Sequence, residues 1–251
     1  GRSEVTDASG DSEGALTVGV ALDDISPFVL SSNRIASGTP ELTVTGEPGS
    51  PVRAVGLRID GASSRGVSVN DVVAALAPEG TGEANVVTAA IDMRDGSFTS
   101  IHDVIDGGDA RGSETPDASE SYGVWLRGGA IALVNGALLA GRADGDAAAV
   151  FRDRAGVAHL VHCAFVPGEA PWDWLVMDEP ESGSRNTYDR PAALERCGDA
   201  WTPARGCGGL TTGPFTLEAS PFARASGAFA DRDYHLASPD ALRDAGFDLE
   251  G

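Results

Sequence analysis

A repeat that occurs five times constrains this chain more than any other feature of its sequence. Its first half reads VGVAL, VGLRI, AAIDM, YGVWL and AAVFR, at Val18–Leu22, Val55–Ile59, Ala89–Met93, Tyr122–Leu126 and Ala148–Arg152. With the second residue of each copy as the anchor, the repeats stand at positions 19, 56, 90, 123 and 149, so the spacings are 37, 34, 33 and 26. A recurring period in this range predicts a solenoid.

A second half follows each first half within a few residues. It comprises LSSNRI, VNDVV, IHDVI, VNGALL and VHCAF, at Leu30–Ile35, Val69–Val73, Ile101–Ile105, Val134–Leu139 and Val161–Phe165. Most of the variation in spacing lies in Gly/Pro/Thr/acidic insertions after the second half, at Gly38–Pro51, Ala77–Asn85 and Asp109–Glu120. Such insertions gather on one side of a solenoid.

Residues within the first half alternate with a period of two, which is typical of a strand with one buried face. Val20, Leu57, Ile91, Val124 and Val150 should therefore stack in one inward column, with coils about 4.8 Å apart. Arg152 stands where an aliphatic residue is expected, so either the register ends there or the fifth coil is distorted.

A polar column is predicted at the corner of the second half. Its members are Asn33, Asn70, His102, Asn135 and His162. Polar side chains at an inward corner can bond to the same position one coil above or below and satisfy backbone groups of the bend. We interpret the two histidines as ladder members rather than catalytic groups.

These coil motifs, of the form (Y/V)GVxL…LVNxxIxxG, resemble the right-handed parallel β-helix repeats of the pectate-lyase-like superfamily. The segment Ser220–Asp248, with its DYHL and SP elements, resembles the closing motif of such bacterial secreted and cell-surface proteins, and Asn186-Thr187-Tyr188 resembles a final coil. The resemblance implies an all-β, right-handed parallel β-helix of about six coils with a C-terminal cap. We divide the chain into a flexible acidic tail (1–14), β-helix coils (15–190) and a final coil with cap (191–251).

Charge and hydropathy exclude two classes of partner. The chain has 38 acidic and 18 basic residues, for a net charge of −20, which argues against nucleic acid or an anionic membrane as partner. The longest stretches without Asp, Glu or Arg, Gly128–Gly141 and Ala155–Gly168, have fourteen residues each, too few to span a bilayer.

The three cysteines predict one disulfide and no zinc site. Cys197 and Cys207 bracket the short segment GDAWTPARG, so we expect a disulfide loop formed in an oxidising compartment. Cys163 lies in an apolar strand and should be a small buried hydrophobe. Without a CxxC motif, a zinc site is not expected.

The third coil holds the best enzymatic candidates. They are Asp92, Arg94, Asp95, His102, Asp103 and Asp106, with Arg127 of the next coil beside them. Outward carboxylates on neighbouring strands could bind Ca²⁺ or form an acid/base pair. The alternative, which we favour, is a solvated strand face without catalytic residues or a metal. The motif set of polygalacturonase-like hydrolases is not present.

Outward aromatic residues point to a ligand or partner surface. Trp125 and Phe151 fall in one outward column on adjacent coils, and Trp172 and Trp174 follow one coil later. Apolar patches of this kind usually mark an interaction site, and sugar rings lie on stacked aromatics. Alternatively, the C-terminal cap folds back over these rings with Phe215, Phe222 and Phe229.

The sequence therefore predicts a non-catalytic extracellular or cell-surface β-helix with a structural, adhesive or filament-forming role and no cofactor. End-to-end or lateral self-association would use the exposed strand edges or faces. The alternative is a polysaccharide-active lyase or hydrolase, or a glycan-binding module.

Overall fold

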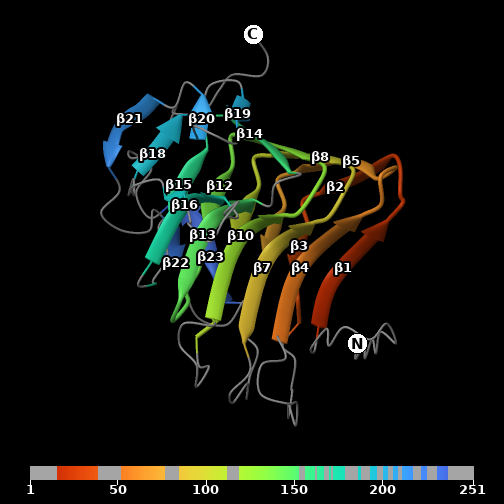
Figure 1. Ribbon diagram of the computed structural model, residues 1–251, viewed down its shortest axis with the longest axis horizontal. Helices are drawn as coiled ribbons and strands as arrows, with labels where there is room; N and C mark the ends of the chain where they lie inside the picture. Colours follow the sequence, from red (N-terminus) through yellow and green to blue (C-terminus); the bar gives the residue numbers. More distant parts are fainter. Residues whose placement is uncertain are drawn as a thin grey trace.

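Stacked parallel strands make up most of the described part of the computed structural model. It describes residues 16–38, 52–76, 85–111, 119–152, 156–161, 163–166, 170, 172–178, 186–187, 193–196, 200–202, 206–208, 211–216, 222–224 and 231–236. Successive coils follow one another from the red N-terminal strands to the green fourth coil (Figure 1), and no α-helix occurs within these described residues.

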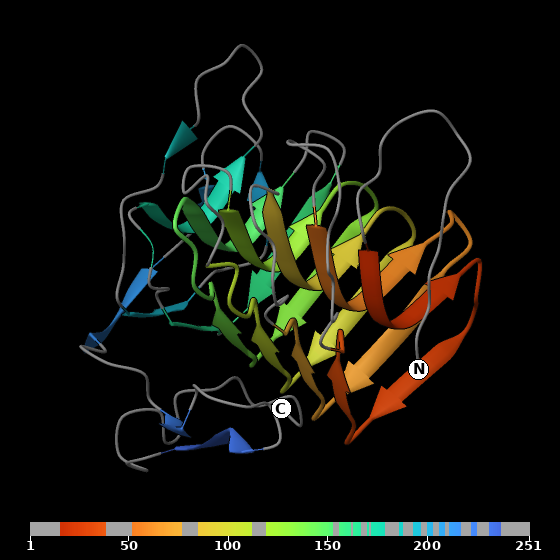
Figure 2. The same ribbon diagram turned by 90° about the horizontal axis from the view of Figure 1, so that it is seen from below.

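Each of the first five coils contributes one strand to each of three sheets (Figure 2). Sheet A consists of β1 (Leu16–Asp23), β4 (Val52–Asp60), β7 (Val86–Met93), β10 (Ser119–Leu126), β13 (Asp146–Arg152), β16 (Trp172–Asp178) and β17 (Asn186–Thr187). Sheet B consists of β2 (Phe28–Ser31), β5 (Arg65–Val69), β8 (Ser97–Ile101), β11 (Ala130–Val134) and β14 (Val157–Val161).

Sheet C consists of β3 (Arg34–Ala36), β6 (Val72–Ala74), β9 (Val104–Asp106), β12 (Ala137–Leu139), β15 (Ala164–Val166), β18 (Ala193–Arg196) and β21 (Thr211–Thr216). Two separate antiparallel pairs are β19 (Ala200–Thr202) with β20 (Gly206–Gly208), and β22 (Phe222–Arg224) with β23 (Asp233–Leu236). Pairing is parallel up to β16, whereas β17 and β18 join antiparallel. The parallel solenoid is thus confirmed, while its handedness, coil count and cap stay predictions.

The register of sheet A matches the predicted repeat. The inward column runs Val20, Leu57, Ile91, Val124 and Val150, as expected. The last four of these side chains have no exposed surface and belong to one core cluster. Leu126 pairs with Arg152, so the register continues through the fifth coil with a buried arginine in an aliphatic column.

The anchor column of the repeat contains only glycine and alanine because two sheets approach closely there. A Cβ atom on Gly56 would lie 2.6 Å from the carbonyl oxygen of Ala74 in sheet C. On Gly123 it would lie 2.5 Å from the carbonyl oxygen of Ala149 in the next coil. The small residues therefore let the strands of sheet A pass the ends of the strands of sheet C.

The repeat holds three strands, and the sequence pattern resolved only two. The predicted second half spans the end of a sheet B strand, a corner and a sheet C strand. The corner residues Ser32, Asn70, His102 and Asn135 have φ between 52° and 57°, the left-handed region that asparagine adopts most readily among non-glycine residues. The insertions follow sheet C, since 39–51, 77–84 and 112–118 lie between sheet C and the next sheet A strand.

Candidate functional site

Two columns of charged side chains lie on the outer face of sheet A, at the ends of its strands. Strand register places Arg58, Asp92, Trp125 and Phe151 in one column. The second column, two residues further along each strand, holds Asp60, Arg94 and Arg127; the backbone N–H groups of both arginines donate to the preceding coil. Period-two alternation puts both columns on the same face.

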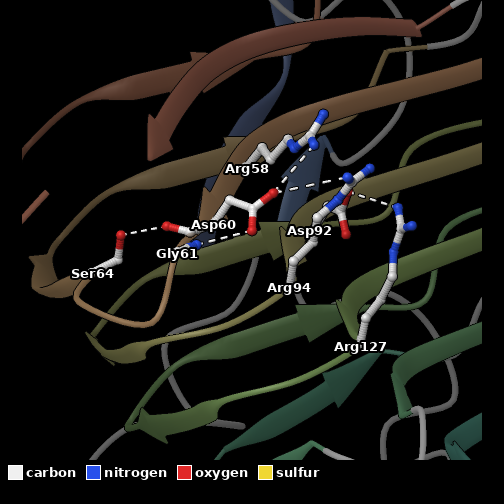
Figure 3. A network of polar contacts seen from close by, with 7 residues as sticks. All are labelled: Arg58, Asp60, Gly61, Ser64, Asp92, Arg94 and Arg127. Carbon is white, nitrogen blue, oxygen red and sulfur yellow. Dashed lines mark hydrogen bonds and ion pairs between the residues drawn. The ribbon is translucent and has the colours of Figure 1, made fainter. Parts of the chain in front are cut away.

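Opposite charges alternate across these columns and form one network (Figure 3). Asp60 Oδ2 lies 3.3 Å from Arg58 Nη2 and 3.8 Å from Arg94 Nη1. Asp92 Oδ2 accepts hydrogen bonds from Arg94 Nε at 3.4 Å and from Arg127 Nη2 at 2.8 Å. Three coils are thereby linked through a continuous series of ion pairs.

The carboxylate of Asp92 is the most deeply placed member of the network. Its side chain has no exposed surface, whereas the side chains of Arg94 and Arg127 are 21% and 23% exposed. A buried charge needs partners, and two guanidinium groups supply them. Burial lowers the pKa of Arg127; the charge of Asp92 opposes this shift, and the charges of Arg94 and Arg53 add to it.

An aromatic cluster adjoins the network on the next coils. The rings of Tyr122 and Phe151 stack with centroids 4.8 Å apart, and the Trp125 ring lies 6.4 Å from that of Phe151. The Arg127 guanidinium sits 3.7 Å from the Trp125 ring centroid, and that of Arg53 sits 5.7 Å from it. Cation–π contacts of this kind hold guanidinium groups on the face of the tryptophan.

Donors exceed acceptors at this site. Arg58, Arg94 and Arg127 pair with two network carboxylates, Asp60 and Asp92, and a fourth arginine, Arg53, lies beside Trp125. Within the described part of the chain, three buried N–H groups have no hydrogen-bond partner: Arg53 Nε, Arg94 Nη2 and Arg127 Nε. The buried acceptor oxygen Asp92 Oδ1 also has no partner there. Unsatisfied polar groups of this kind are uncommon and are often explained by a ligand or water.

The predicted third-coil constellation is divided among several places. Only Asp92, Arg94 and Arg127 come together. Asp95 is exposed in the turn after β7, where Oδ1 accepts a hydrogen bond of 2.7 Å from the Gly96 N–H. His102 is exposed at the corner between sheets B and C. These positions do not form one acid/base site.

Asp103 lies inside the solenoid. Its Oδ2 accepts hydrogen bonds from the hydroxyls of Ser68 and Ser100, and its Oδ1 accepts one of 2.8 Å from the Asp71 N–H. Burial raises the pKa of Asp103, the three hydrogen bonds oppose this shift, and the nearby charge of Asp71 adds to it. We interpret this carboxyl as a structural element of the inner corner.

Asp106 is bound by the C-terminal part of the chain at the outer side of sheet C. Its Oδ2 accepts hydrogen bonds of 2.7 Å from both Arg232 Nη1 and the Tyr234 hydroxyl. Phe222 packs on Leu139 of β12 and lies edge-on to Tyr234, with ring centroids 5.6 Å apart. The proposed covering of Trp125 by Phe222 is therefore wrong; Phe215 and Phe229 have no described side chain.

The predicted polar ladder is offset at its first member. Ser32 occupies the column of Asn70, His102 and Asn135, while Asn33 lies one residue further and donates to Asp71 Oδ1. Asn135 Nδ2 lies 3.2 Å from His102 Nε2, in one rung of the ladder. The column borders the outer surface instead of pointing inward, and His162 lies outside the described residues.

Among the predicted surface aromatics, Trp125 and Phe151 are neighbours in one column. The backbone of β16 pairs Trp172 with Asp146 and Trp174 with Ala148. The residue of β16 that pairs with Phe151 and continues its column is Met177. The register therefore sets both tryptophans apart from the Trp125 column. Their side chains are outside the described part of the structure.

Cys163 is a buried free thiol, as predicted, and its Sγ donates to the carbonyl oxygen of Leu133 at 3.3 Å. Cys197 lies outside the described residues, and Cys207 is described only as backbone in β20, so their disulfide stays a prediction.

Across the described residues, no three carboxylate, histidine or cysteine side chains are placed to hold a metal such as Ca²⁺. Among the described residues there is no helix that is long and apolar enough to cross a membrane.

Four members of this site were missed by sequence reasoning. They are Arg53, Arg58, Asp60 and Tyr122, all on strands of sheet A. The signal was available for Arg58 and Asp60, because aligned repeats place them beside Asp92 and Arg94. Tyr122 precedes the anchor glycine, where the strand register is interrupted, so alternation alone assigns it to the inward face.

Comparison with protein-family models, with curated proteins and with solved structures finds no match to this chain.

Proposed function

We propose that the protein is a non-catalytic β-helix of the extracellular space or the cell surface, with an adhesive role, that binds an acidic polysaccharide across the outer face of sheet A. One observation carries this proposal. Three arginines pair with two carboxylates beside an aromatic cluster that a fourth arginine, Arg53, also contacts, and the side chains of Arg94 and Arg127 remain 21% and 23% exposed.

The charge of the ligand follows from the arginines. A guanidinium group presents a planar set of donors that matches a carboxylate or sulfate group, often with two parallel hydrogen bonds. The network of ion pairs holds three arginines and two carboxylates, a local excess of one positive charge in a chain whose net charge is −20. An anionic group can pair with the partly exposed guanidinium groups of Arg94 and Arg127.

The polymeric, carbohydrate nature of the ligand follows from the layout of the face. Equivalent positions repeat once per coil, about 4.8 Å apart, so the charged and aromatic residues form a row along the solenoid axis. Arg58 and Asp92 lead into Trp125 and Phe151 along one column. A linear chain of sugars can contact the aromatic end with its ring faces and the arginine end with its acidic groups.

Binding is favoured over acid–base catalysis by the state of Asp92. A general acid or base must reach the proton that it transfers. The Asp92 carboxyl has no exposed surface and its Oδ2 is held by two guanidinium groups. Its role in the proposal is to position Arg94 and Arg127.

Calorimetric titration with oligosaccharides of defined charge tests the proposal. Oligogalacturonate, alginate fragments and chondroitin sulfate oligosaccharides serve as acidic probes, and fully methyl-esterified oligogalacturonate is the neutral counterpart. At least one acidic probe should bind, the neutral one should bind at least tenfold more weakly, and added salt should weaken binding of the acidic probe.

Matched variants locate the site. Arg127→Ala should weaken binding at least tenfold, whereas Arg111→Ala, which removes the same charge from an exposed side chain after sheet C, should leave it unchanged. No binding of any acidic probe, equal affinity for the esterified probe, or an unaffected Arg127→Ala variant would each overturn the proposal.

A further inference from the structure

We infer that the outer face of sheet B is an interface through which two copies of this chain associate side by side. The described residues that point outward from this sheet alternate with the core residues of the same strands. They are Val29, Ser31, Arg65, Val67, Val69, Ser97, Thr99, Ile101, Ala130, Ala132, Val134, Val157 and His159.

The composition of this face differs from that of the chain as a whole. The chain has 38 acidic residues, yet none of these outward positions holds a carboxylate. Sheet A carries Asp60 on its outer face, and sheet C carries Asp106. In a molecule with a net charge of −20, a face without carboxylates is the place where a like-charged copy meets the least repulsion.

Exposed apolar side chains gather on the same face. Three large hydrophobic residues are exposed among the described residues: Val29 at 72%, and Ile25 and Val157 at 43% each. Val29 and Val157 lie at the two ends of the outward set, on β2 and β14, and Ile25 precedes β2. Partly exposed Val67, Ile101 and Val134 lie on the three strands between them and connect the two ends. Continuous apolar surface on a soluble protein usually marks an interaction site.

The border of the face is polar, as in protein interfaces. Asp24 and Asp95 lie in the turns before the strands, and Asn70, His102 and Asn135 lie at the corner after them. Arg65 is exposed at the start of strand β5, so its guanidinium can stay in water while its aliphatic stem is covered. An apolar centre within such a rim fits a face that meets another protein.

A second copy is the occupant that these features fit. Two sheets can pack face to face about 10 Å apart with interdigitating β-branched side chains, and an identical face provides the same uncharged, valine-rich surface. Five strands about 4.8 Å apart and about five residues long outline roughly 400 Å² per copy. This area is at the low end for specific interfaces, so the dimer should be weak and depend on concentration.

Such a dimer would place two sheet A faces in one particle, which would raise avidity for a polymer that offers repeated sites. The self-association itself does not depend on the glycan proposal. The two respond oppositely to salt: salt screens the repulsion between two acidic chains and strengthens the dimer, whereas it weakens binding of an acidic glycan.

Sedimentation velocity of the full chain over a hundredfold concentration range, at low and high salt, tests the interface. Thr99 lies on the middle strand of the face, so a two-fold axis through the centre brings the two copies of this residue close together. Thr99→Glu should weaken the dimer at least tenfold. Ala62→Glu adds the same charge in the exposed turn between β4 and β5 and should have no such effect.

Charge reversal keeps the test independent of any effect on folding. Thr99→Glu and Thr99→Arg proteins should each be monomeric, and their equimolar mixture should form a heterodimer. A wild-type chain that stays monomeric at every concentration and salt level would overturn the inference. So would a dimer that Thr99→Glu leaves intact, or a mixture that fails to associate.

Discussion

Two buried aspartates on different outer faces of the solenoid have partners of different origin. On sheet C, Asp106 receives Arg232 and the Tyr234 hydroxyl from a segment more than 120 residues away, and its Oδ1 accepts a hydrogen bond from the Gly108 N–H. On sheet A, Asp92 receives Arg94 and Arg127 from its own and the next coil. Both carboxylates are almost fully buried.

The difference lies in what remains unpaired. Both oxygens of Asp106 accept hydrogen bonds. Burial alone would lower the pKa of Arg232, but the charges of Asp106 and Tyr234 and the hydrogen bonds to both groups together raise it. Around Asp92 the pKa of Arg127 is lowered, and N–H groups of Arg94 and Arg127 lack partners among the described residues. A closed polar cluster stabilises the fold, whereas an open one retains capacity for a ligand.

The largest expected effect is therefore at the closed cluster. Arg232→Ala leaves Asp106 buried without its cation, which should lower the free energy of unfolding by about 3–5 kcal/mol. Urea denaturation followed by circular dichroism measures this loss. A loss below about 1 kcal/mol would mean that the C-terminal segment is not fastened to sheet C through this pair.

Tyr234→Phe should remove a smaller amount, about 1.5–3 kcal/mol, because the hydrogen bond to Asp106 and the longer one of 3.4 Å from Arg232 are lost while the Arg232–Asp106 pair remains. Burial raises the pKa of Tyr234, and the charge of Asp106 raises it further. The contribution of the neutral phenol is fully present below the unfolded tyrosine pKa of about 10 and is lost as the pH rises through the folded value. Between about pH 10 and 12 the wild-type chain should lose stability faster than Tyr234→Phe, and parallel profiles would contradict this assignment.

Sequence reasoning predicted the inner side of the solenoid far better than its outer side. Repetition of Val20, Leu57, Ile91, Val124 and Val150 at equivalent positions fixed the register, because a slip by one residue would move every aliphatic side chain to the solvent face. Sheet B was overlooked as a separate strand because its inward column contains Ser68 and Ser100, which weaken the apolar alternation.

The candidate site could be predicted only in part. Asp92, Arg94 and Arg127 lie close in aligned repeats, so their grouping was readable. Asp106 was assigned to the same group because local sequence does not show that Arg232 and Tyr234 return to sheet C. Contacts of such large sequence separation depend on the course of the chain through space, which no repeat period encodes.

Arg127→Ala should lower the free energy of unfolding by only about 1 kcal/mol. Arg94 still neutralises Asp92, and the loss of one charged hydrogen bond and one cation–π contact is largely offset, because removing the guanidinium also removes the cost of its desolvation. The same urea titration as for Arg232→Ala allows direct comparison. A loss as large as that of Arg232→Ala would show that the network on sheet A stabilises the fold as much as the Asp106 cluster does. The proposed difference between the two clusters would then be wrong.

The smallest effect is expected at a third buried aspartate, Asp103, which hydroxyls and a backbone N–H bind without a cation. Burial raises its pKa, so its contribution to stability is fully present below the unfolded value of about 3.9 and is lost as the pH rises through the folded value. Asp103→Asn removes this titration. The stability of that variant relative to the wild type should therefore rise as the pH increases from about 4 to 7.

Asp109→Asn is the matched control because it predicts the opposite sign. Burial alone would raise the pKa of Asp109, but hydrogen bonds from Arg111 and the charges of Arg111 and Arg142 outweigh burial and lower it. The stabilisation from Asp109 is present above the unfolded value of about 3.9 and is lost as the pH falls through the folded value. Relative to the wild type, Asp109→Asn should thus become less stable between about pH 2 and 5 as the pH rises. Chemical denaturation of both variants across pH 2–7 would show slopes of opposite sign. Slopes of the same sign would mean that a neighbouring cation does not decide whether the pKa of these two carboxyls is raised or lowered.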